Sequence, residues 1–180
     1  MSYFTSGLAA TLIGVVTFTA ACGGRTETPA TDTASAVATT PTAAAAASGG
    51  WTYDQNKALE GYVVCTTCHQ VSGLGTEGTY PPLAGSDIVQ GDPARVVAII
   101  LHGLQGELNV GGKKYNNVMT PWGGVFDDTQ IANIATYIRS QWGNSASQVT
   151  PDLVAKVRAA TSSRTAAWTW PEVEKFTVQP

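Results

Sequence analysis

The stretch Cys65-Thr66-Thr67-Cys68-His69 decides how the rest of this 180-residue chain is interpreted. Two cysteines separated by two residues and followed at once by histidine form the signature of c-type haem attachment. Each thiol adds across one vinyl group of the porphyrin, so the two sulfur atoms must lie one short turn apart. The covalent attachment then places the next side chain, His69, under the iron as its proximal ligand.

The same Cys-x-x-Cys spacing also occurs in zinc sites and in thiol redox centres, and the composition argues against both. A structural zinc site uses four ligands, whereas this chain has three cysteines and two histidines, of which Cys22 and His102 lie far apart. A thioredoxin-like motif lies next to a βαβ pattern, and none surrounds residue 65. A plain disulfide between Cys65 and Cys68 would leave His69 without a role. We therefore interpret the stretch as the attachment site of one covalent haem c.

A haem that carries electrons takes a second axial ligand, and the chain offers two candidates. Met119 is the one methionine besides Met1, and Pro121 and Gly123 interrupt its loop, which could hold the sulfur against a flat ring. The rival is His102, at the end of an apolar helical segment. A lone methionine usually fills a core, and a lone histidine on an apolar helix is usually a hydrogen-bonded structural residue. We favour Met119, because Met/His ligation raises the reduction potential as a carrier requires.

The first 22 residues are predicted to direct export. Residues 1–24 carry no charged side chain, and residues 7–21 are largely apolar, which is typical of an export signal. Thr19-Ala20-Ala21-Cys22 looks like a bacterial lipobox with threonine where leucine is usual, so Cys22 is the expected lipidation site. The alternative is an uncleaved anchor, because about two dozen uncharged residues are enough to cross a bilayer.

Residues 23–50 are predicted to be a disordered linker. They consist almost entirely of Ala, Thr, Ser, Pro and Gly, without an aromatic residue and with Val37 as the sole branched aliphatic one. Such a segment buries too little apolar surface to offset its ordering entropy. Either N-terminal interpretation therefore places a tethered head on the periplasmic or extracytoplasmic face of a bacterial membrane. Haem attachment to Cys-x-x-Cys-His in bacteria occurs on the same side.

The head, residues 51–165, is predicted to consist of short helices joined by loops. Asp54 can cap a first helix that leads into the haem motif. Asp92-Pro93 combines an N-cap with proline at the first helical position, and Gly103 closes that second helix. Thr150-Pro151 begins a last helix, which runs to about residue 160.

The best-marked helix follows Asp127, which forms a capping-box pattern with Gln130. We expect its apolar face to pack on Leu59 and Tyr62 of the first helix, and Gly143 to end it. The apolar residues at helical spacing are Ile131, Ile134, Ala135, Ile138 and Trp142.

Two further segments complete the head. Residues 108–115 suggest a small hairpin about Gly111-Gly112, and residues 166–180 form an aromatic tail that packs on the head or contacts a partner. The porphyrin is expected to be a large part of so small a core. The side chains expected to cover it are Leu83, Val97, Ile100, Leu101 and Trp122.

Over about residues 51–160 the chain resembles the class I cytochromes c. It has the haem motif after an N-terminal helix, a Pro-Pro-Leu loop, a distal methionine loop and a closing amphipathic helix. It is most similar to the monohaem domains attached to copper nitrite reductases and to membrane dehydrogenases and oxidases. The matching stretches are Pro81-Pro82-Leu83-Ala84-Gly85-Ser86, Leu101-His102-Gly103-Leu104-Gln105-Gly106 and Trp142-Gly143-Asn144.

The resemblance implies an all-α cytochrome c fold, with short helices around one covalent haem and a small hairpin before the methionine loop. It implies that the Pro81 carbonyl accepts the Nδ1–H of His69 and orients the ring. It also implies that His102 is structural, which supports Met119 as the ligand. Thr120 departs from the pattern, since proline commonly follows the ligand methionine.

The expected function is a membrane-tethered one-electron carrier, and not an enzyme, between respiratory partners such as a membrane oxidase, reductase or dehydrogenase complex. The alternative is a haem enzyme or gas sensor with an open sixth coordination site, which would need His102 as its polar distal group. The formal net charge is −3 and no basic stripe occurs, so nucleic acid is not indicated as a partner.

Overall fold

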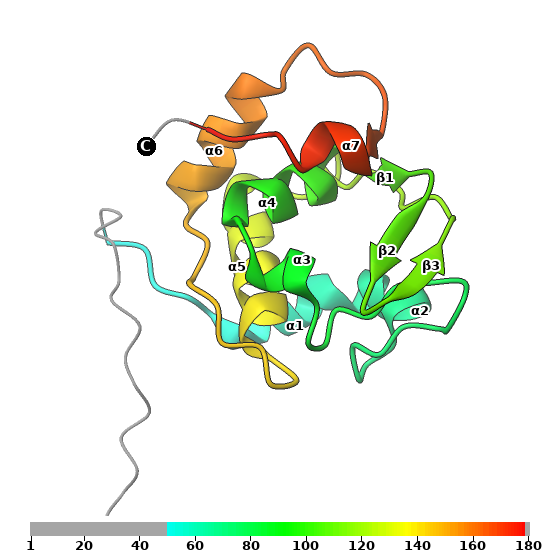
Figure 1. Cartoon of the computed structure of the whole chain (residues 1–180). Helices are drawn as coiled ribbons and strands as arrows, with labels where there is room; N and C mark the ends of the chain where they lie inside the picture. Colours follow the sequence, from blue (N-terminus) through cyan, green and yellow to red (C-terminus); the bar gives the residue numbers. More distant parts are fainter. Residues whose placement is uncertain (1–49, 179–180) are drawn as a thin grey trace, which may run out of the picture. The chain divides into compact units, whose positions relative to one another are not determined.

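The computed structural model describes residues 50–178, and most of their regular structure is helical (Figure 1). The predicted export segment 1–22 with Cys22, and the predicted linker through residue 49, lie outside the described residues. Within the described part of the chain, no helix has the length and apolar character needed to cross a membrane.

The predicted helices and the predicted hairpin are present, and α3, α7 and the short β1–β4 pair are additional elements that the sequence did not predict. The helices are α1 (Gln55–Tyr62), the 3-10 turn η1 (Val63–Cys65), α2 (Thr66–His69), α3 (Asp87–Gln90), α4 (Pro93–His102), α5 (Asp128–Ser140), α6 (Pro151–Ala160) and α7 (Trp170–Val173). The strands are β1 (Leu104–Gln105), β2 (Leu108–Val110), β3 (Lys113–Tyr115) and β4 (Trp168–Thr169). Strands β2 and β3 pair in antiparallel fashion, which confirms the hairpin.

Side-chain oxygen atoms cap the four longer helices at the predicted residues. The Asp54 and Asp92 side chains accept backbone N–H groups in the first turns of α1 and α4. Asp127 and Gln130 form both hydrogen bonds of the capping box, and the Thr150 hydroxyl accepts a backbone N–H of α6. These caps satisfy donors that a helix start leaves unpaired, so local sequence sets the start of each helix.

Helix α1 crosses α5 closely, and the residues that make the contact differ in part from those predicted. Tyr62 is buried as expected, but the prediction for Leu59 is wrong, since its side chain is 41% exposed. The other buried residues of α1 are Ala58 and Gly61. A Cβ atom at Gly61 would lie 2.6 Å from Cδ1 of Ile134, so the close crossing requires glycine there.

Helix α5 ends at Ser140, two residues earlier than predicted. Gln141 adopts an extended conformation after the last helical residue, and Trp142 follows with a left-handed φ of +54° before Gly143. The turn brings the Trp142 ring against Tyr62 and Tyr137, with centroid distances of 5.4 and 5.5 Å. Aromatic packing with α1 and α5 therefore decides where the helix ends.

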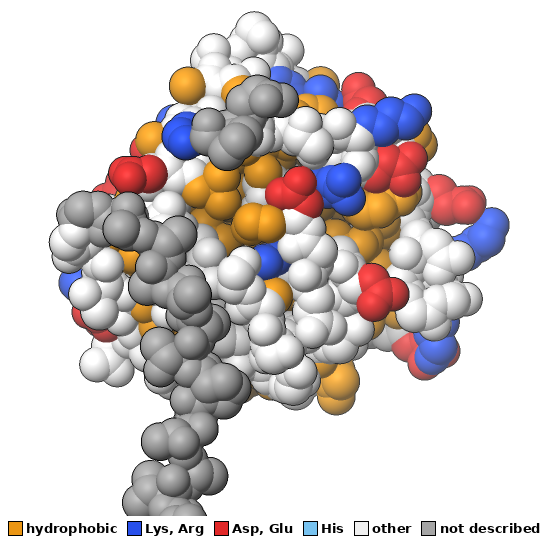
Figure 2. All heavy atoms as spheres, turned by 60° about the vertical axis from the view of Figure 1, so that its left-hand side comes forward, with side chains coloured by type: hydrophobic (Ala, Val, Ile, Leu, Met, Phe, Trp, Pro, Cys, Tyr) orange, Lys and Arg blue, Asp and Glu red, His pale blue; other side chains and the backbone are white. Residues whose placement is uncertain are grey.

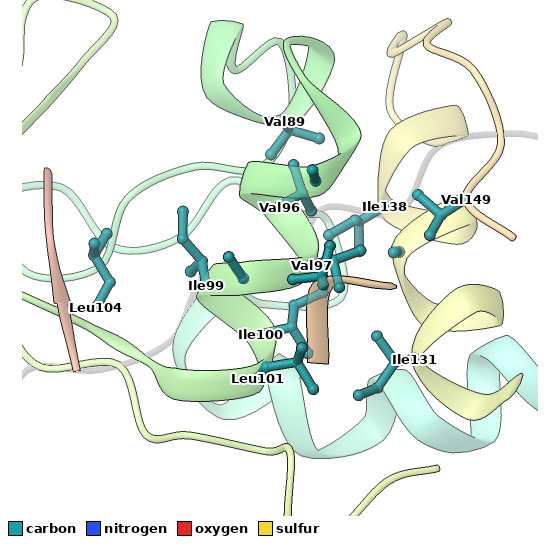
Figure 3. Packing of buried hydrophobic residues seen from close by; sticks show 14 of the residues in the cluster. Val89, Val96, Val97, Ile99, Ile100, Leu101, Leu104, Ile131, Ile138 and Val149 are labelled. Atoms are coloured by element: carbon teal, nitrogen blue, oxygen red, sulfur yellow. The ribbon is translucent and has the colours of Figure 1, made fainter. Parts of the chain in front are cut away.

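Helix α4 lies at the centre of the core. Its buried residues are Ala94 and the run from Val96 to Leu101. Figure 3 shows its Val97 and Ile100 side chains close to Ile131 and Ile138 of α5. Helix α6 packs against both α4 and α5. An element buried on more than one face must be apolar nearly all round, as the α4 sequence is.

The aromatic tail beyond residue 165 packs on the head. Strand β4 runs parallel to β1, with Leu104 paired to Trp168 (Figure 1). Trp168 is 7% exposed, and Val173 of α7 is fully buried. Acidic and basic side chains are interspersed on the face shown in Figure 2, without a patch of one sign.

Arg139 of α5 is a buried cation that forms no ion pair with a carboxylate of residues 50–178. Its side chain is 1% exposed, and it donates hydrogen bonds to the carbonyl groups of Val89, Gly91 and Ser147. Burial lowers the pKa of the guanidinium. The group thus joins α5 to the end of α3 and to the loop after α5, at a cost in desolvation.

We expect Arg139→Met to lower the free energy of unfolding by about 3 kcal/mol, because it leaves buried carbonyl groups without donors. Guanidinium unfolding of the haem-containing protein measures this loss. Lys156→Met, at an exposed position of α6, is the matched control and should change stability by no more than about 0.5 kcal/mol. A loss in Arg139→Met as small as that of the control would show that its carbonyl groups find other partners.

Candidate functional site

Two adjoining pockets lie between the Cys-x-x-Cys-His stretch and the Met119 loop. The space that each outlines, open solvent included, is about 740 and 760 Å³. Both are lined by Cys65, His69, Pro81 and Met119, and Cys68 lines the first. The structure therefore brings together all the site residues predicted for the head.

The first wall is built by a nearly continuous helical path. Helix α1 leads through η1 into α2, and the Thr66 hydroxyl donates to the Val63 carbonyl at 2.7 Å. The two cysteines lie one turn apart and are not joined in a disulfide. Gln70, with a φ of +64°, ends α2 directly after His69.

The loop after His69 returns to it because Gly75 permits a close backbone approach. A Cβ atom at Gly75 would lie 2.3 Å from the Tyr80 carbonyl oxygen. The fold-back places the Pro81 carbonyl 3.0 Å from Nδ1 of His69. A carbonyl oxygen only accepts, so Nδ1 carries the proton and Nε2 keeps its lone pair for a metal ion.

Burial shifts the pKa of the His69 ring and of the Cys65 thiol. It lowers the pKa of His69, against a smaller opposite effect of the Pro81 hydrogen bond, so the ring is neutral at neutral pH. It raises the pKa of the Cys65 thiol to about 11, with a smaller contribution from Cys68. A thiol that stays protonated is a poor redox nucleophile. The described residues also contain no group of three or more His, Cys, Asp or Glu that could hold zinc.

Backbone hydrogen bonds hold Met119 in a loop that also lines both pockets. Its N–H donates to the Leu104 carbonyl at 2.8 Å, and the Leu104 N–H donates to the Met119 carbonyl at 3.3 Å. The loop is fixed again after Met119, where the N–H groups of Trp122 and Gly123 donate to the last turn of α4. The methionine is thus anchored on both sides to α4 and β1.

His102, the rival ligand, points elsewhere. Its Nε2 lies 2.7 Å from the Thr161 hydroxyl, and its ring meets Trp168 edge-on at 6.4 Å between centroids. It lines neither of the two pockets. The two adjoining pockets together are called the hollow below. Of the two candidates for a second axial ligand, Met119 alone lines it.

The walls of the hollow are apolar, with corrections to the predicted set. Leu83, Ile100 and Trp122 line it as expected, but Val97 and Leu101 do not and pack elsewhere in the core. The reason is that α4 is buried on several faces and only one faces the hollow. Sequence reasoning missed several lining residues from the hairpin region, α5 and the Met119 loop: Leu104, Leu108, Val110, Val118, Phe126, Ile134 and Ile138.

The donor set and the walls together fit a porphyrin. A flat apolar macrocycle would fill the space between hydrophobic side chains, with two thiols at one edge. A neutral imidazole and a thioether line the same space and would be available as neutral donors for iron. The alternation of Leu108 and Val110 with an exposed Asn109 was the one signal in the sequence that could have identified the hairpin as a wall.

Comparison with known proteins gives one family. Residues 57–142 match the family model described as Cytochrome c. Cytochrome c-552 of Thermus thermophilus is 36% identical over 101 residues, which covers 54% of this chain and 68% of that protein. The fructose dehydrogenase cytochrome subunit of Gluconobacter japonicus is 35% identical over 53% of this chain. The cytochrome c subunit of the quinone alcohol dehydrogenase of Gluconacetobacter polyoxogenes is 35% identical over 52%. The chain spans only 20% of each of these two subunits.

Proposed function

The chain belongs to the cytochrome c family, and on that premise we propose that it carries single electrons with His69 and Met119 as axial ligands. Members of this family bind haem c covalently, and the Cys65–Cys68 spacing fits that attachment. The bound haem supplies an iron that accepts and returns one electron. The observation that carries the ligand assignment is that His69 and Met119 line the same hollow, while His102 is bonded to Thr161.

The chain's own residues have separate tasks in this proposal. Cys65 and Cys68 tether the porphyrin edge, and the Pro81 carbonyl holds the His69 ring in one orientation. The thioether of Met119 is a neutral, soft donor that favours the reduced state. The apolar walls keep water from the centre, so little solvent must reorganise when charge moves.

An open sixth site, as in a haem enzyme or gas sensor, gains no support from the geometry. That function would need a polar group above the ring, and His102 was its candidate. The structure places His102 outside the hollow. We therefore retain the carrier as the single proposal.

The N-terminal proposals concern residues outside the described part. We propose that residues 1–22 direct export, that Cys22 carries lipid and that residues 23–50 link the anchor to the head. Bacterial c-type cytochromes are usually extracytoplasmic, which agrees with a tether on that side of the membrane. Relatives whose names identify them as dehydrogenase cytochrome subunits support a redox protein partner, and we propose a membrane oxidase, reductase or dehydrogenase complex.

Intact mass and the visible spectrum test the proposal together. The full chain, made in a bacterial host that ligates haem, should gain the mass of one haem, and lipidation at Cys22 adds a separate increment. The ferric protein should show low-spin bands and a weak far-red band from sulfur to iron. High-spin bands or carbon monoxide binding at rest would point to the open-site alternative. Absence of any added haem mass would end the proposal.

The mouth of the first pocket indicates how a partner docks. Val64 and Val118 stand there with exposures of 38% and 63%, beside the uncharged Asn117 and Thr120. Among the described residues that line this pocket, none carries a charge at neutral pH, because His69 is neutral. We propose that redox encounters use this apolar rim and are weak and brief.

Electron self-exchange between ferrous and ferric copies tests the rim without a known partner. We expect the wild-type rate, measured by NMR line broadening, to depend little on salt. Val118→Lys should slow it about tenfold at low ionic strength, with recovery in high salt, because like charges then meet at the contact. The control Ala159→Lys adds the same charge at an exposed position on α6. Equal slowing in both variants would show that net charge, and not the rim, sets the rate.

A further inference from the structure

The C-terminal segment is joined to the Met119 loop through a small backbone ladder. Strand β1 is paired on one edge with β4, where Leu104 lies opposite Trp168 in parallel register. On its other edge, Leu104 forms an antiparallel bridge with Met119. Leu104 is therefore the middle member of a ladder whose outer members are Trp168 and Met119. Trp168 lies beyond residue 142, where the match to the family model ends.

Gly103 shows how tightly the middle of this ladder is packed. Its φ is +77°, and a Cβ atom there would lie 2.2 Å from the Met119 carbonyl oxygen. The Gly103 carbonyl accepts the backbone N–H of Trp168 at 3.1 Å. The Gly103–Leu104 backbone is thus hydrogen-bonded to the tail and touches the Met119 loop. If the tail shifts, this backbone is held less firmly, and the Met119 loop packed against it can move more easily.

Side-chain contacts fix Trp168 independently of the strand pairing. The indole N–H donates to the Ala98 carbonyl of α4 at 3.1 Å in a buried hydrogen bond. The Arg164 guanidinium lies 3.5 Å from the centroid of the Trp168 ring, and the Phe176 ring packs against it at 5.3 Å. The indole thus ties β4 to the central helix.

We propose that strand β4 acts as a positioning element for the axial sulfur, with Trp168 holding β1 and β1 holding Met119. This inference rests on the proposed ligation by Met119. Thr120 leaves the backbone after Met119 without the restraint that proline would impose, so the register of the loop depends on its hydrogen bonds. A tail that fixes β1 keeps the thioether close to one position and opposes its replacement by an outside ligand.

Trp168→Ala in the full-length, haem-containing protein tests the proposal with two readouts. Amide hydrogen exchange at Met119 should become at least about tenfold faster, because local opening of the ladder becomes easier. The affinity of the ferric protein for added imidazole should rise by about the same factor, because the loop releases the iron more often. Exchange at Ile134 in α5 should change much less.

Two further variants separate the outcomes. Trp170→Ala removes a partly buried indole from the same tail outside the ladder and should leave exchange at Met119 within about twofold of wild type. Trp168→Phe keeps an aromatic ring but loses the bond to Ala98, and should give a smaller effect of the same kind. Unchanged exchange at Met119 and unchanged imidazole affinity in Trp168→Ala would overturn the proposal and leave the tail as a cover.

Failure of the ligand assignment would look different. If Met119→Ala bound imidazole no more tightly than wild type, Met119 would not be the iron ligand and the proposed ligation would fall. The amide exchange of residue 119 in Trp168→Ala does not depend on what binds the iron, so it would still report whether the tail holds the loop.

Discussion

The Cys65→Ala/Cys68→Ala double variant, freed of non-covalent haem, is expected to lack a cooperative unfolding transition. More than a dozen apolar side chains line the two pockets and would face a void or water without the porphyrin. Each Leu, Ile or Val side chain that loses its burial costs about 1.5–3 kcal/mol. Loss of burial at most of these positions would exceed the roughly 5–15 kcal/mol that a domain of this kind has in reserve. Calorimetry and near-ultraviolet circular dichroism measure the result.

The single variant Cys65→Ala is the control for this experiment. It keeps Cys68 and His69, so one thioether bond should still retain the haem and a cooperative transition should remain at a lower temperature. A double variant that melts cooperatively without haem would show that the polypeptide forms its core alone. The interpretation of the hollow as the interior surface of a haem site would then need revision.

Met119→Ala is expected to remove the far-red sulfur-to-iron band and to convert the ferric spectrum to one with a high-spin component. The reduction potential should fall by on the order of 0.1 V or more, since axial ligands set potentials over a span of roughly 0.8 V. The ferrous form of the variant should also bind carbon monoxide. Visible spectra and a spectroelectrochemical titration measure these changes.

Two substitutions serve as controls for the ligand assignment. Val125→Ala changes an exposed side chain after the Met119 loop that lines neither pocket, and should leave spectrum and potential as in wild type. His102→Gln removes the rival ligand and should also leave the spectrum unchanged, because His102 is bonded to Thr161 outside the hollow. A low-spin ferric spectrum that survives Met119→Ala and is lost in His102→Gln would reverse the assignment.

Local features of the chain could be predicted because they depend on neighbours a few residues apart. The Cys65–Cys68 spacing and the adjacent His69 define the attachment chemistry within one turn. The caps at Asp54, Asp92, Asp127 and Thr150 each act within three residues, so their helices begin where expected. The hairpin follows from turn chemistry at Gly111-Gly112.

Contacts between distant segments could not be predicted in the same way. Helical periodicity predicted that Leu59 contacts α5. In the structure the two helices cross so closely that the contact needs glycine at position 61, and Leu59 is exposed to solvent. The same limitation applies to α4, since periodicity does not say which of its apolar faces meets a cofactor. For α5, packing of Trp142 on two tyrosines overrides the pattern that predicted a longer helix.

The sequence by itself determined that this chain attaches a haem, because five consecutive residues supply both thiols and the proximal histidine. Only the tertiary structure decided which side chains surround the hollow and that His102 turns away from it. It also decided that strand β4, more than sixty residues after β1 in the chain, pairs beside the Met119 loop. The physical reason is that backbone pairing between distant segments depends on how the whole core packs, and no local pattern encodes it.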